Sequence, residues 1–147
     1  MPSAMCYAGE KRETIEMSAA DNKKLIQEAF QAWGRGDGNA FFNLLADDVH
    51  WTVIGNTAVS RTYTSKAGFQ EGAVRPLNGK LAGGIVPTVR DIIAEGDKVV
   101  LQWDGRGTGK NGTIYSQTYC WVMRIENGKV REGTAYLDTE LITQLFK

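Results

Sequence analysis

The chain has 147 residues, a length that fits one domain with a sizeable core and leaves little room for a second domain. Its 17 basic and 17 acidic side chains give a formal net charge of +0, so the charge balance favours small or neutral partners over nucleic acid or an anionic membrane. Cys6 and Cys120 are far apart and form neither a CxxC metal pattern nor a disulfide framework, which favours a reducing, cytoplasmic location.

The N-terminal stretch MPSAMCYAGEKRETIEM is polar, and its apolar residues follow no period. It contains no continuous apolar segment long enough for a signal peptide, and nowhere does the chain show the roughly 18 consecutive apolar residues of a membrane helix. We interpret residues 1–17 as a polar extension whose composition favours disorder. Residues 18–147 are then expected to form a single domain.

Two helices are expected first. Ser18 and Asp21 have the spacing of a capping box, and the residues after them place one apolar face on a helix. That face consists of Leu25, Ile26, Ala29, Phe30 and Trp33. Gly34 and a second glycine end this helix, and Asp37 can cap a shorter second helix that runs to about Ala46.

A strand is predicted from Val49, where the apolar period changes from helical spacing to strict alternation. Asp47 and Asp48 stand between the second helix and this strand, which favours a solvated turn over acid/base machinery. The only histidine, His50, alternates with Trp51 and therefore faces the opposite side of the strand. A structural or surface role is favoured for His50, although a histidine can also titrate near neutral pH.

The stretch SKAGFQEGAVRPL is less regular. It can hold a short helix that is capped by Ser65 and interrupted before Pro76. Beyond it, three turn signals separate apolar-rich runs, and Asn-Gly between such runs is a strong indication of a hairpin. The resulting antiparallel strands are 86–94, 98–109, 113–126 and 129–137. A short final helix is expected after Asp138 or Thr139 as its cap.

This order of elements, with helices first and a long antiparallel meander afterwards, predicts an α+β domain whose helices cover one face of a sheet. A long twisted sheet curls, and helices on its concave side leave a cone with an interior cavity. The predicted strand 113–126 has one aromatic face with polar tips. That face comprises Tyr115, Gln117, Tyr119, Trp121 and Met123. It suits a pocket for an apolar ligand, but it suits a core or a dimer interface equally well.

Several stretches in this order resemble the NTF2-like superfamily, in its SnoaL-like, ketosteroid isomerase-related branch. They are the first helix ending in GRGD, followed by LLADDVHWTVIG, IIAEGDKVVLQWDGRGT, YSQTYCWVMRIENGKV and YLDTELI. The resemblance runs from about residue 18 to the end. It implies an NTF2-like, cystatin-like cone of N-terminal helices packed on a curved antiparallel sheet, a homodimer, and a mostly apolar pocket. Members include isomerases, cyclases, epoxide hydrolases, dehydratases and proteins that only bind, so the fold alone does not give the function.

The same resemblance allows the catalytic positions to be compared one at a time. Val53 stands near the place of the ketosteroid isomerase base, and Ala29 or Phe30 near that of its tyrosine donor, so that chemistry is not supported. Ala135 lacks the carboxylate that limonene-type epoxide hydrolases carry there. In SnoaL-type cyclases an aspartate late in the last strand acts as acid and base, and Asp138 can correspond to it. A helix cap explains Asp138 equally well.

These comparisons leave two hypotheses. One is a cofactor-free isomerase, cyclase or hydrolyase in which Asp138, if buried beside Gln117 or Tyr119, works with Tyr119. The other is a non-catalytic ligand-binding or dimerisation module. Either would hold a small hydrophobic molecule, and the predicted ligand-binding residues are Phe30, Trp51, Val53, Tyr63, Trp103, Tyr115, Gln117 and Trp121. No cluster of histidine, cysteine and carboxylate has metal spacing, and the glycine-rich GRGTGKNG lies between strands, so neither a metal nor a cofactor is expected.

Overall fold

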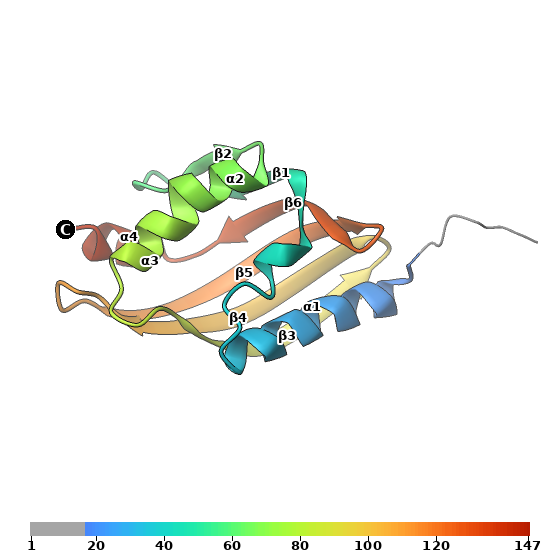
Figure 1. The fold of residues 1–147 in the computed structure, drawn as a ribbon, viewed down its shortest axis with the longest axis horizontal. Helices are drawn as coiled ribbons and strands as arrows, with labels where there is room; N and C mark the ends of the chain where they lie inside the picture. Colours follow the sequence, from blue (N-terminus) through green and yellow to red (C-terminus); the bar gives the residue numbers. More distant parts are fainter. Residues whose placement is uncertain (1–16) are drawn as a thin grey trace, which may run out of the picture.

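The computed structural model describes residues 17–147, so the predicted N-terminal extension lies outside the described residues except for Met17. Helices lie on one side of a curved six-stranded sheet (Figure 1). The strands are β1 (Leu45–Val53), β2 (Arg61–Tyr63), β3 (Val86–Glu95), β4 (Lys98–Thr108), β5 (Ile114–Glu126) and β6 (Lys129–Tyr136). They are arranged in the order β2-β1-β6-β5-β4-β3, which confirms the α+β class.

The first helix, α1 (Ala19–Gly34), forms as its sequence predicts. The Ser18 Oγ accepts a hydrogen bond from the Asp21 N–H at 3.1 Å, and the Asp21 Oδ2 accepts one from the Ser18 N–H at 3.1 Å. This capping box satisfies two of the N–H groups that a helix leaves free at its start. The apolar face, with Ile26 and Phe30 fully buried, packs against β3 and β4.

The predicted second helix is wrong. A turn region and a single 3-10 turn, η1 (Phe42–Leu44), replace it, and β1 already begins at Leu45. The Asp37 Oδ1 accepts a hydrogen bond from the nearby Asn39 N–H at 3.2 Å, so its side chain closes a local turn. Leu45 pairs with Val130 of β6, and this long-range pairing overrides the helical pattern.

Residues 66–79 form one helical segment of three parts, α2 (Lys66–Phe69), a π segment (Gln70–Val74) and α3 (Arg75–Gly79). The Ser65 cap is confirmed, because its Oγ accepts a hydrogen bond from the Gly68 N–H at 2.9 Å. The predicted interruption before Pro76 is wrong. Pro76 lies in the first turn of α3, where a missing N–H is tolerated, and the wider π segment carries the helix up to it.

The four predicted strands of the meander match β3 to β6 within two residues at each end. Asn127 and Gly128 adopt positive φ values of 52° and 76°, as a tight hairpin turn requires. The sheet is mixed rather than wholly antiparallel, because β1 pairs with β6 in parallel. The last helix, α4 (Thr139–Leu145), begins at its cap Asp138, whose Oδ1 accepts a hydrogen bond from the Glu140 N–H at 3.0 Å.

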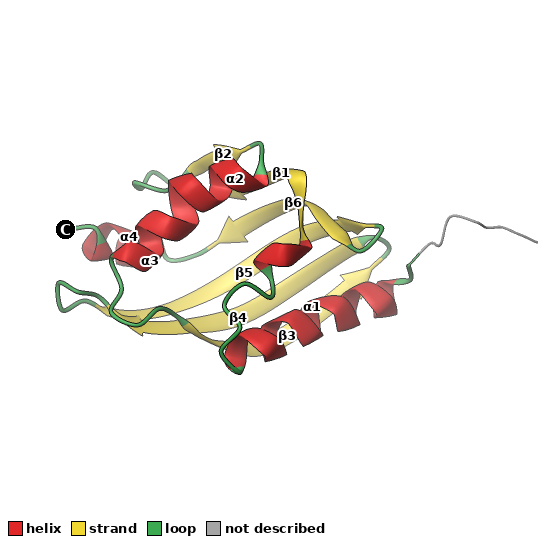
Figure 2. Ribbon diagram, viewed as in Figure 1, coloured by secondary structure: helices red, strands yellow, loops and turns green. Residues whose placement is uncertain are grey.

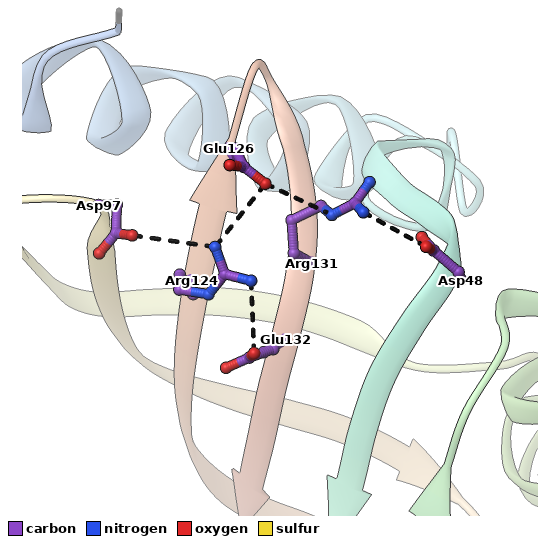
Figure 3. Close-up of polar contacts among 6 residues, drawn as sticks. All are labelled: Asp48, Asp97, Arg124, Glu126, Arg131 and Glu132. Atoms are coloured by element: carbon purple, nitrogen blue, oxygen red, sulfur yellow. Dashed lines mark hydrogen bonds and ion pairs between the residues drawn. The ribbon is translucent and has the colours of Figure 1, made fainter.

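Asp48 lies in β1 and takes part in an ion-pair network rather than in a turn (Figure 3). Its Oδ2 is 3.3 Å from Arg131 Nη2, and Arg124 Nη2 is 3.3 Å from Glu132 Oε2. Glu126 links the two arginines at 3.7 Å and 3.8 Å. Because these side chains remain solvent-accessible, each pair contributes about 0–1 kcal/mol. His50 is also exposed, on the face opposite the buried Trp51, as the alternation predicts.

The parallel pairing of β1 with β6 depends on a close approach between Trp51 and Gly133, which face each other in register. A Cβ atom on residue 133 would overlap the six-membered ring of Trp51. From this position the Trp51 ring stacks on Phe69 of α2, with ring centroids 5.2 Å apart, and meets Trp121 of β5 at 5.0 Å. Gly133 therefore lets one indole connect the helical segment to the centre of the sheet.

We expect Gly133→Ala to lower the free energy of unfolding by about 2–3 kcal/mol, because overpacking forces the Trp51 ring off its position. Urea denaturation followed by tryptophan fluorescence measures this loss. Gly79→Ala is the matched control, since an added methyl group there meets nothing within 4 Å. Equal denaturation midpoints for the two variants would show that the contact with Trp51 is not a constraint.

Candidate functional site

A cavity of about 420 Å³ lies between the inner face of the sheet and the helical side of the molecule. This volume is within the range of small-molecule sites, about 300–1,000 Å³. Aromatic rings form much of its wall, namely Trp33, Phe42, Trp51, Phe69, Trp103, Tyr119 and Trp121. Aliphatic side chains supply most of the rest, namely Val53, Val59, Ala73, Val74, Leu77, Ile85, Val86, Pro87, Ala135, Leu137 and Ile142.

Neighbouring strands bring the rings of the sheet wall together. Trp103 on β4 is directly opposite Tyr119 on β5, and their rings stack with centroids 4.3 Å apart and planes 12° apart. Trp121 follows two residues later on the same face of β5, and its ring meets Trp103 edge-on at 4.9 Å. The three rings therefore form one contiguous aromatic cluster on the sheet side of the cavity.

Two loops that are rich in glycine complete the lining. One comprises the end of α1 and the turn after it and contributes Gly34, Gly36 and Gly38, and the other precedes β3 and contributes Gly83 and Gly84. A Cβ atom at any of these five positions would meet nothing within 4 Å. The backbone of both loops therefore borders open space beside the cavity.

Among the lining residues only Tyr119 has an ionisable side chain. Burial raises the pKa of Tyr119 well above its ordinary value, and the neighbouring Tyr115 raises it further. The other polar side-chain groups of the lining are the amide of Asn78 and the indole N–H groups. Those of Trp103 and Trp121 have no hydrogen-bond partner in the described part of the chain. The cavity wall is therefore neutral at physiological pH and offers donors rather than bases.

A buried polar cluster lies next to the cavity. The hydroxyl oxygens of Tyr115 and Tyr119 are 2.5 Å apart, at the short end of the range for O–H···O bonds. Gln117, fully buried between them on β5, donates from Nε2 to the Asp138 carbonyl at 2.9 Å and accepts at Oε1 from the Asp138 N–H at 2.7 Å. Its side-chain amide thus fixes the start of α4 against the sheet.

The structure places the predicted ligand-binding residues in two groups. Those on the cavity wall are Trp51, Val53, Trp103 and Trp121. The other four predicted residues are not among the lining residues. Phe30 is buried among the rings of Trp33, Phe41, Trp103 and Trp121, and Tyr63 donates its hydroxyl proton to the Val59 carbonyl at 2.7 Å. Tyr115 and Gln117 lie in the buried polar cluster.

The two predicted catalytic residues, Tyr119 and Asp138, do not lie at the same site. Tyr119 is on the cavity wall, but Asp138 is exposed and is not among the lining residues. Burial of the Asp138 carboxylate, the condition for its proposed acid/base role, is not met. Its backbone contacts Gln117, while its side chain caps α4.

The sequence reasoning missed the contribution of the helical segment 66–79. Phe69, Ala73 and Leu77 repeat every four residues and line the cavity as one helix face. That spacing was visible in the sequence, but the expected break before Pro76 hid it. The two glycine loops carried no signal of their own, because a loop's position beside a cavity depends on the elements that it connects.

No cluster of three or more histidine, cysteine, aspartate or glutamate side chains that could hold a metal ion occurs within residues 17–147. Over the same residues, no helix is both long and apolar enough to span a bilayer.

A family model described as a SnoaL-like domain matches residues 26–133. No match was found among curated proteins. Three solved structures show how widely the fold is shared. An NTF2-like protein from Burkholderia thailandensis has a TM-score of 0.73 at 20% identity, covering 92% of this chain and 99% of its own. A protein of unknown function with a cystatin-like fold from Xanthomonas campestris has a TM-score of 0.66 at 27% identity, covering 88% and 98%. TerC, co-crystallised with polyporic acid, has a TM-score of 0.69 at 22% identity, covering 84% and 96%.

The raised pKa values of Tyr115 and Tyr119 predict a loss of stability at alkaline pH. Below about pH 10 both tyrosines are neutral in the folded and unfolded chains, so their contribution is fully present. Above it the unfolded chain ionises first, and stability falls as the pH rises toward the folded-state pKa values. Urea unfolding at a series of alkaline pH values measures the slope, which Tyr119→Phe is expected to reduce. If stability fell equally steeply with pH in wild type and in Tyr119→Phe, ionisation of Tyr119 would not contribute to the loss.

Proposed function

The chain belongs to the SnoaL-like family of the NTF2-like superfamily, and we propose that its cavity binds one small, largely hydrophobic molecule. The composition of the cavity wall carries the proposal. Aromatic and aliphatic side chains surround about 420 Å³, and a few neutral donors interrupt them. Such a wall holds a ligand by burial of apolar surface and uses hydrogen bonds only to orient it.

A flat, ring-containing ligand fits this wall best. The stacked pair of Trp103 and Tyr119, with Trp121 edge-on beside it, offers a ring face and a ring edge at once. Aromatic contacts of both kinds are favourable by about 0.5–1.5 kcal/mol beyond the area they bury. The structural neighbour TerC was crystallised with polyporic acid, which supports the same class of ligand for this fold without transferring that compound to this chain.

Binding is favoured over acid/base catalysis by the absence of carboxylate, histidine and basic side chains from the described lining. A cofactor-free isomerase, cyclase or hydrolyase would need a group that takes up a proton near neutral pH. Tyr119 does not meet this need, because burial raises its pKa. For Asp138 to act, its carboxylate would have to leave the Glu140 N–H and enter the cavity.

We also propose that the chain forms the homodimer that its family resemblance implies, through the outer face of the sheet. Within residues 17–147, the helices α1, α2 and α3 lie in front of the sheet and leave its other face uncovered (Figure 2). An apolar row crosses that outer face in register, made of Ile93, Val100 and Val122. Ile93 is 56% exposed, and a second copy of the chain would cover it.

The ligand proposal is tested with the fluorescent probe N-phenyl-1-naphthylamine, which brightens in apolar surroundings. We expect one probe molecule to bind per chain. Ala135→Leu should weaken binding about tenfold or more, because the larger side chain projects from β6 into the cavity. Ala20→Leu, at an exposed position of α1, is the matched control. Equal affinity in the two variants would place the probe outside the cavity.

The dimer proposal is tested by light scattering coupled to size-exclusion chromatography. The wild-type protein is expected at twice the chain mass of 16.2 kDa, and Val122→Glu at the chain mass, because a buried unpaired charge opposes association. Ala20→Glu, at an exposed position of α1 on the opposite side of the sheet, is the control. A monomeric wild type would refute the dimer and leave the cavity unaffected.

A further inference from the structure

The hydrogen bond between the Tyr115 and Tyr119 hydroxyls leaves one of their two protons free. Tyr115 and Tyr119 carry one hydroxyl proton each, and the 2.5 Å contact between their oxygens uses one of the two. The direction of that bond decides which residue keeps a free proton. If Tyr119 donates, Tyr115 must place its own proton elsewhere. If Tyr115 donates, the free proton belongs to Tyr119.

Gln117 determines the direction. Its side-chain amide is fixed, because Oε1 accepts from the Asp138 N–H and Nε2 donates to the Asp138 carbonyl, and a flipped amide would break both bonds. The group that Gln117 presents to the Tyr115 hydroxyl, at 3.5 Å, is therefore the donor Nε2. Gln117 cannot accept a proton from Tyr115.

Tyr115 is fully buried, and within residues 17–147 its hydroxyl oxygen contacts only Tyr119 and Gln117 at hydrogen-bond distance. A Tyr115 proton that did not point to Tyr119 would be buried without an acceptor, which costs about 1–3 kcal/mol. Tyr115 therefore donates to Tyr119. The proton of Tyr119 is then left without an acceptor in the described chain. Of the two residues only Tyr119 is among those that line the cavity, where a ligand can supply the missing acceptor.

We infer that the Tyr119 hydroxyl donates a hydrogen bond to an oxygen of the bound molecule, so that the ligand is a flat apolar compound bearing a carbonyl-type acceptor. The inference rests on the proposed function, since it needs a ligand in the cavity. The Tyr115 hydroxyl is the positioning group, because its own donation turns the Tyr119 proton away from the cluster. A chain of hydrogen bonds in which each donor also accepts strengthens the terminal donor.

The raised pKa of Tyr119 is consistent with this role, because a neutral phenol keeps its proton at physiological pH. The stacking on Trp103 holds the ring in place and limits its rotation. A ligand carbonyl that meets this donor is recognised without any charge on the protein. An analogue that lacks the oxygen keeps the apolar contacts and loses only the hydrogen bond.

The test uses two probes with the same ring system, 9-fluorenone and fluorene, which differ by the carbonyl group. Quenching of the cavity tryptophans gives the dissociation constant of each, and the ratio of fluorene to fluorenone constants is the ketone preference. We expect the preference to fall about tenfold from wild type to Tyr119→Phe, the size of one ordinary hydrogen bond, while fluorene affinity stays within about twofold. Tyr115→Phe should give an intermediate preference. Tyr136→Phe, on the exposed outer face, should match wild type.

The outcomes separate the two proposals. If both probes bind and Tyr119→Phe leaves the ketone preference unchanged, the inference is overturned and the cavity proposal stands. The unpartnered indole N–H of Trp103 or Trp121 would then be the donor. If neither probe binds to wild type, the proposed function fails and the inference fails with it.

Infrared spectra of bound fluorenone give a second readout on the wild-type protein alone. The carbonyl stretch should shift to lower frequency than in hydrocarbon solvent, and an unshifted band would overturn the inference.

Discussion

The close approach of Trp51 to Gly133 organises the packing of the helical segment 66–79 against the sheet. Because residue 133 has no side chain, the indole of β1 lies across β6 and reaches Phe69 on one side and Trp121 on the other. This one ring thereby joins the helical segment 66–79 to the centre of the sheet. It also holds the two walls of the cavity at a fixed separation, because both pack against the same rigid side chain.

The cavity that results differs in its chemistry from a general acid/base site. Its described lining is mainly apolar, and its polar side chains are neutral, namely the phenol of Tyr119, the amide of Asn78 and the indole N–H groups. The polar residues Gln117 and Tyr115 are buried beside the cavity and do not line it. Gln117 fixes the start of α4, and Tyr115 orients the hydroxyl of Tyr119. A satisfied buried network of this kind rigidifies its surroundings, so recognition here rests on a preorganised donor in an apolar site rather than on charge.

Much of the fold was readable from local pattern. The capping box at Ser18, the turn at Asn127-Gly128 and the alternation along β5 depend on neighbours within a few residues, and each formed as predicted. Two predictions failed, one because of a distant partner and one because of an irregular turn within the helical segment itself. The second helix gave way to the pairing of Leu45 with Val130, and Pro76 was accommodated by a π segment that no short pattern announces.

At the site, the period of a strand was enough to predict which residue types share a face. Strand alternation placed Tyr115, Gln117, Tyr119 and Trp121 together on the buried side of β5. Which of these side chains border the cavity could not be predicted from the alternation, because it depends on the packing of other elements. Tyr119 and Trp121 line the cavity, whereas the start of α4 lies against Gln117. The side chain of Asp138 turns outward and caps that helix. The period of a strand fixes the direction of its side chains. The elements packed above them come from distant parts of the chain, and these elements decide whether a side chain meets a cavity or another group.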